Sequence, residues 1–158
     1  MANLTGTQPT DWRSDGSLAY GLFRLTFGIN IMMRGIVRIY HGLPAFQNYM
    51  LTQFKDVPEM PPVFLIPFAT VLPFIETLIG LCIVFGFQTR TALIAGALMI
   101  TALTFGTMMR QDFTIAWLQL DYALAFFILL ALRSWNLISV DAMMRGGSHA
   151  TSAARMTT

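Results

Sequence analysis

The chain has 158 residues, of which 55% are hydrophobic and 11% charged, whereas a typical soluble domain is about 25% charged. This deficit of charge favours a membrane protein. A net charge of +2 without a basic cluster speaks against nucleic acid as a partner. One cysteine and two distant histidines speak against an internal disulfide and against a metal centre.

The first segment, residues 1–17, is polar and mixed in charge. It lacks the basic start, short apolar core and small-residue cleavage site of a signal peptide. It is therefore expected to be an uncleaved cytoplasmic leader, with the first spanning helix as the insertion signal.

Four stretches are long and apolar enough to cross a bilayer, which takes roughly 20 residues. They are residues 18–40, 63–87, 91–109 and 113–132. The links between the last three are very short, so these helices are expected to be antiparallel neighbours. The sequence thus predicts an all-α fold, an integral membrane four-helix bundle over residues 18–132.

The long link between the first two spans, residues 41–62, has a helical apolar pattern. Its apolar positions are Phe46, Tyr49, Met50, Leu51 and Phe54. Such spacing predicts an amphipathic helix in the membrane interface between helices one and two. Beyond the fourth span, residues 133–158 are expected to form a polar C-terminal tail, disordered from 146 onward.

Lysine and arginine near the helix ends indicate the orientation. With four spans, both termini lie on one side. That side holds Arg13, Arg90, Arg133 and Arg145, whereas the opposite side holds Arg38, Lys55 and Arg110. This small excess predicts that both termini face the cytoplasm.

Ionisable side chains inside the spans are costly and usually find a partner within the bundle. Four such residues are Arg24, Arg34, Glu76 and Asp121. Matching their depths predicts the ion pairs Arg34–Asp121 and Arg24–Glu76, with Arg34–Glu76 as the main alternative. These pairs either fix helix register or belong to a polar cavity with ligand binding or proton relay.

Polar and aromatic side chains also gather at the outer ends of the first and fourth spans. Donors together with an apolar groove suit a quinone. The candidate ligand-binding residues are Arg34, His41, Arg110, Gln111, Trp117 and Gln119. The alternative is that His41 and Trp117, with Tyr122, are ordinary interface anchors. No metal, flavin or nucleotide site is indicated.

Several segments together resemble the DoxX family of small four-helix membrane proteins. They are residues 27–38, 41–42, 72–76, 85–93, 103–107 and 110–112. The resemblance covers about residues 18–141. It implies a bundle similar to the vitamin K epoxide reductase architecture and kinship with the DoxD-type membrane subunit of thiosulfate:quinone oxidoreductase. The chain lacks the cysteines of the thiol-redox relatives, so that chemistry is not carried over.

These observations lead to a first hypothesis, a membrane subunit of a quinone-linked oxidoreductase in the bacterial inner membrane. It would be surrounded by lipid, bind quinone in the outer part of the bundle and work with another protein subunit that carries the redox centre. The alternative is a non-enzymatic scaffold or accessory subunit that anchors a larger membrane complex. A small-molecule carrier is a third possibility, disfavoured because the chain lacks internal repeats.

Overall fold

The computed structural model describes residues 12–144, and within this range every regular element is a helix. The elements are α1 (Asp15–Tyr40), α2 (Leu43–Gln53), α3 (Pro62–Phe85), α4 (Thr89–Met109), α5 (Phe113–Ala131) and the 3₁₀ turn η1 (Arg133–Trp135). The prediction of an all-helical fold is confirmed. The leader before residue 12, and the tail from residue 145, lie outside the described residues.

Three of the helices, α3, α4 and α5, are long and apolar enough to cross a membrane. Their outward faces carry many exposed large apolar side chains, as lipid contact requires. The chain is therefore a membrane protein. The longer helix α1 is not among these three, because three arginines interrupt its apolar sequence.

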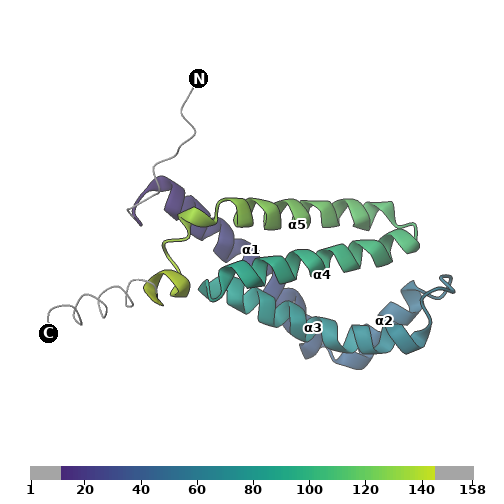
Figure 1. Ribbon diagram of the computed structural model, residues 1–158. Helices are drawn as coiled ribbons and strands as arrows, with labels where there is room; N and C mark the ends of the chain where they lie inside the picture. The colour runs from purple at the N-terminus through teal and green to yellow at the C-terminus, as the bar shows by residue number, and fades with distance from the viewer. Residues whose placement is uncertain (1–11, 145–158) are drawn as a thin grey trace, which may run out of the picture.

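Helix α1 lies along α3 and approaches it closely where both helices have glycine (Figure 1). A methyl group on Gly80 of α3 would collide with the backbone of Met32 on α1. A methyl group on Gly35 of α1 would collide with the Pro73 carbonyl and with Thr77 on α3. Small residues thus bring the two backbones together, as is common between membrane helices.

Helices α4 and α5 form an antiparallel pair joined by a tight turn (Figure 1). The Phe126 ring of α5 lies against Gly96 of α4, and it meets the ring of Phe27 on α1 edge to face at 4.8 Å. Both Phe126 and its neighbour in the core, Leu93, are almost fully buried. The core of the bundle therefore runs from α1 through α3 and α4 to α5.

Helix α2 occupies the link in which an amphipathic helix was predicted. Its buried residue Met50, together with Phe54 just beyond the helix, packs on Leu65 and Ala69 of α3. Tyr49 of α2 is 51% exposed. The apolar face of α2 is thus covered by the protein itself.

The start of the predicted polar tail is folded against the bundle. Asn136 and Ser139 are buried, and the Asn136 amide donates a hydrogen bond to the Thr89 hydroxyl at 3.0 Å. The Asp141 carboxylate accepts from the backbone N–H groups of Gln88 and Thr89, each at 2.8 Å. Asp141 therefore caps the N-terminus of α4, a role that composition alone does not reveal.

Candidate functional site

The candidate site is a cavity of about 830 Å³ between α2, α3, α4, the C-terminal half of α1 and the N-terminal half of α5. We call it the arginine-lined cavity, because Arg34, Arg38 and Arg110 all contribute to its wall. Most of the remaining wall is apolar and aromatic. The cavity thus combines a cationic region with an apolar groove.

Each of the three guanidinium groups lies over an aromatic ring. Arg34 lies 4.9 Å from the ring centre of Tyr122, Arg38 lies 4.5 Å from that of Phe46, and Arg110 lies 5.2 Å from that of Phe54. A cation held over a ring face in a poorly hydrated site is stabilised by about 2 kcal/mol. The rings therefore position the arginines without neutralising them.

Arg38 also forms an ion pair with Glu76 of α3, whose side chain is 2% exposed. The pair joins α1 to α3 at the edge of the cavity. Glu76 was expected to pair with Arg24, or else with Arg34, and this expectation is wrong. The depth of a residue along a straight helix does not fix how two helices are aligned. The close contact between α1 and α3 sets their register and brings Arg38 opposite Glu76.

Arg24 has a different role, since it donates to backbone carbonyls rather than to a carboxylate. Its guanidinium bonds the oxygens of Ile83 (2.6 Å) and Val84 (3.1 Å) near the end of α3, and that of Ile138 (2.8 Å) in the C-terminal segment. Carbonyls in the last turn of a helix have no partner within the helix. Arg24 therefore ties α1, the end of α3 and the C-terminal segment together.

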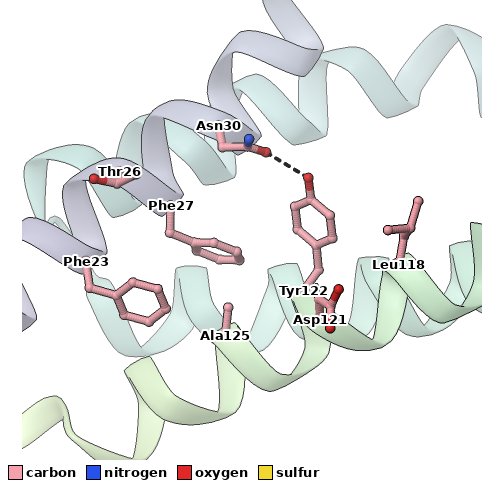
Figure 2. A pocket seen from close by; sticks show the side chains of 8 residues that line it. All are labelled: Phe23, Thr26, Phe27, Asn30, Leu118, Asp121, Tyr122 and Ala125. Atoms are coloured by element: carbon pink, nitrogen blue, oxygen red, sulfur yellow. Dashed lines mark hydrogen bonds between the residues drawn. The ribbon is translucent and has the colours of Figure 1, made fainter.

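The predicted ion pair between Arg34 and Asp121 is not formed. Arg34 faces the arginine-lined cavity, whereas Asp121 is exposed in a separate groove between α1 and α5 (Figure 2). The Arg34 guanidinium lies over the ring of Tyr122, which also lines that groove.

Arg110 lines the cavity from the turn between α4 and α5. It contacts the side-chain oxygen of Gln53, at the end of α2, and the carboxylate of Asp112 at 3.3 Å. Asp112 also accepts from the backbone N–H of Ile115 and so caps α5. Arg110 therefore links α2 to the α4–α5 turn above the cavity.

Gln119 of α5 supplies the other polar group in the wall. Its amide nitrogen donates to the Thr107 hydroxyl at 3.0 Å, and that hydroxyl donates to the Leu103 carbonyl. Its amide oxygen is buried and has no hydrogen-bond partner among the residues that the structure describes. Such an unpaired acceptor is uncommon in a folded protein and suits a ligand that brings a donor.

Three of the six predicted ligand-binding residues, Arg34, Arg110 and Gln119, line this cavity, and the other three lie outside it. His41 is exposed at the end of α1 beside Tyr40. Gln111 is exposed in the α4–α5 turn, and Trp117 is 69% exposed on α5. Trp117 is two positions from Gln119, about 200° around the helix, so the two side chains cannot face one cavity.

Sequence reasoning did not identify the apolar part of the cavity wall. Phe46, Met50 and Phe54 were assigned to an interfacial helix, yet all three line the cavity. Their helical spacing predicted a common face but not the surface that it would cover. Arg38 follows Arg34 by one helical turn, and like charges at this spacing are unfavourable without a carboxylate nearby, which is the signal in the sequence that could have identified Arg38.

The cavity opens to the surface of the bundle between α3 and α4. Phe64 and Phe68 of α3, and Leu98 and Phe105 of α4, line it and are themselves exposed. Both helices are apolar enough to lie in a membrane. The cavity therefore opens on the face that meets lipid.

Fold and site together define a helical membrane protein with a cationic, aromatic cavity that opens toward lipid. The DoxX family model matches residues 20–110, which is more than half of the chain. The chain belongs to the DoxX family, and the predicted resemblance is confirmed. No curated protein and no solved structure matches it significantly. The match ends before α5, so it does not cover Gln119 or Asp121.

Proposed function

We propose that this chain is the membrane subunit of a quinone-linked oxidoreductase and that it binds quinone in the arginine-lined cavity. A separate redox partner subunit delivers the electrons. The observation that carries the proposal is the presence of three arginine side chains and Gln119 in the wall of one mostly apolar cavity. DoxX membership agrees with this role through the family's kinship to a quinone-linked enzyme.

The size and polarity of the cavity fit a quinone ring. Ligand cavities typically measure about 300–1,000 Å³ and have mostly apolar walls with a few directed polar groups. Quinone carbonyl oxygens accept hydrogen bonds, which Arg34 can donate. The Gln119 side chain adds a further polar group to the wall. The lipid-facing opening between α3 and α4 gives an isoprenoid tail a path into the membrane.

In this arrangement the quinone supplies the two-electron chemistry when bound, and the chain's own residues orient it. Arg34 is the least neutralised of the three cations, since no carboxylate within the described residues pairs with it. Glu76 holds Arg38 in place and is the nearest candidate for a proton relay. Asp121, the other candidate, lines the separate groove between α1 and α5 and not the cavity.

We further infer that α1 crosses the bilayer as the fourth helix of the bundle. At 26 residues it is about 39 Å long, which exceeds the apolar thickness of a membrane. Its arginines are directed inward: Arg24 is buried, and Arg34 and Arg38 face the cavity. With four spans, the excess of lysine and arginine near the ends puts both termini in the cytoplasm, in a bacterial inner membrane with α2 at the outer interface.

The test is to purify the protein in mild detergent and measure saturable binding of a short-tailed quinone. We expect Arg34→Gln to weaken binding at least tenfold. Arg90→Gln serves as the matched control, since Arg90 is exposed and outside the cavity. Absence of both co-purified quinone and saturable binding would overturn the proposal and favour the accessory-subunit alternative.

A further inference from the structure

A second feature of the membrane region lies outside the arginine-lined cavity. It is a groove of about 400 Å³ between α1 and α5, shown in Figure 2. Its walls are formed by Phe23, Thr26, Phe27 and Asn30 on α1 and by Leu118, Asp121, Tyr122 and Ala125 on α5. The spacing on each helix is that of one face over two helical turns. A groove between two such faces has the form that receives a third helix.

Asp121 places a carboxylate in this groove near the middle of the membrane. It is the ninth residue of the 19-residue helix α5, about 12 Å from one end and about 15 Å from the other. Lipid head groups lie at the membrane surfaces, so they cannot reach it. A carboxylate at this depth is costly unless it faces protein, water or a partner charge.

Two other polar side chains of the groove, Tyr122 and Asn30, bond each other. The Tyr122 hydroxyl donates to the Asn30 side-chain oxygen at 3.0 Å, as Figure 2 shows. No lysine, arginine or histidine within residues 12–144 pairs with Asp121. Arg34, the cation expected there, lies over the Tyr122 ring and lines the arginine-lined cavity. Asp121 therefore leaves one unmatched negative charge in the groove.

Helix α5 is also the least covered of the three apolar helices. In an apolar stretch of 18 residues, 17% of α5 is buried inside the structure, compared with 39% of α3 and 33% of α4. The groove thus lies on the side of the bundle that this chain covers least.

We propose that the α1–α5 groove binds a transmembrane helix of another protein and that this helix carries a lysine or arginine near its middle. The apolar walls would pack against the helix, and Asp121 would pair with its cation. The proposal does not depend on what the arginine-lined cavity binds.

The probe is a synthetic leucine–alanine transmembrane peptide with one central lysine, and the control peptide has leucine in its place. Energy transfer from the labelled full chain to each labelled peptide is measured in phosphatidylcholine vesicles. We expect the lysine peptide to reach half-saturation at a roughly tenfold lower peptide-to-lipid ratio. Asp121→Asn should abolish this difference. Leu120→Asn, an exposed position of α5 outside the groove, should preserve it.

A charge exchange tests the pairing directly. The Asp121→Lys variant should prefer a peptide with a central aspartate to the lysine peptide. Equal binding of lysine and leucine peptides by the unchanged chain would overturn the proposal. So would Asp121-dependent energy transfer between two labelled copies of the chain alone, which would assign the groove to self-association.

Discussion

Arg38 on α1 and Glu76 on α3 form an ion pair inside the bundle, with the arginine side chain 25% exposed and the glutamate side chain 2% exposed. This pair connects the two helices that approach each other most closely. It also neutralises one of the three cations around the cavity. Its loss is therefore expected to affect both the packing of the bundle and the charge of the site.

The substitution Glu76→Gln removes the charge with little change of shape. We expect it to lower the free energy of unfolding by about 3 kcal/mol, because it leaves Arg38 without its counter-charge in a poorly hydrated site. Unfolding in detergent is the measurement. The double variant Arg38→Gln/Glu76→Gln should recover part of the loss.

The control for that substitution is Asp56→Asn, which breaks the exposed pair with Lys55. An exposed pair contributes little, so stability should be unchanged within error. If Glu76→Gln were as stable as this control, the ion pair would not hold α1 against α3.

The close approach of α1 and α3 predicts an unequal response of two glycines to alanine. Gly80→Ala places a methyl group against the Met32 backbone, which cannot move aside easily. We expect a loss of about 2 kcal/mol in unfolding free energy, typical of overpacking. Gly21→Ala meets only an ordinary contact with Ile138 and should be neutral or stabilising. Equal effects of the two substitutions would contradict the packing described above.

The capping of α4 by the C-terminal segment predicts that Asp141 contributes to stability. Asp141→Ala removes the acceptor for two backbone N–H groups at the start of α4. A loss of about 1–2 kcal/mol is expected, together with faster proteolysis of the C-terminal segment. Glu59→Gln, in the exposed loop between α2 and α3, is the control. Unchanged proteolysis would show that the segment is held by other contacts.

Substitution of Gln119 is expected to change ligand binding while leaving the stability of the protein nearly unchanged. Gln119→Met keeps the approximate volume and removes a buried oxygen that has no partner, at the cost of the hydrogen bond to Thr107. These effects oppose each other, so stability should stay within about 1 kcal/mol of the unchanged chain. Quinone affinity should fall about tenfold, as measured by titration of a short-tailed quinone. A large loss of stability with unchanged affinity would assign Gln119 a structural role.

The sequence alone determined the helical membrane character of this protein. Long apolar segments can satisfy their backbone groups in lipid only as helices or closed barrels, and the length of these segments selects helices. The polar landmarks such as Glu76 and Arg90 also sufficed to indicate the DoxX family, which the family match confirms. Arg34, Arg110 and Gln119 were found because donors and acceptors are rare within such segments.

The tertiary structure decided which of these residues meet. Depth along an isolated helix does not specify rotation or register, and both were set here by the contact of Gly35 and Gly80 with the facing backbone. That contact brings Arg38 rather than Arg24 to Glu76. Helix rotation likewise puts Arg34 in the wall of a cavity inside the bundle and Asp121 in a groove on its surface. Packing of side chains between helices, which no single segment encodes, is the physical reason for this division.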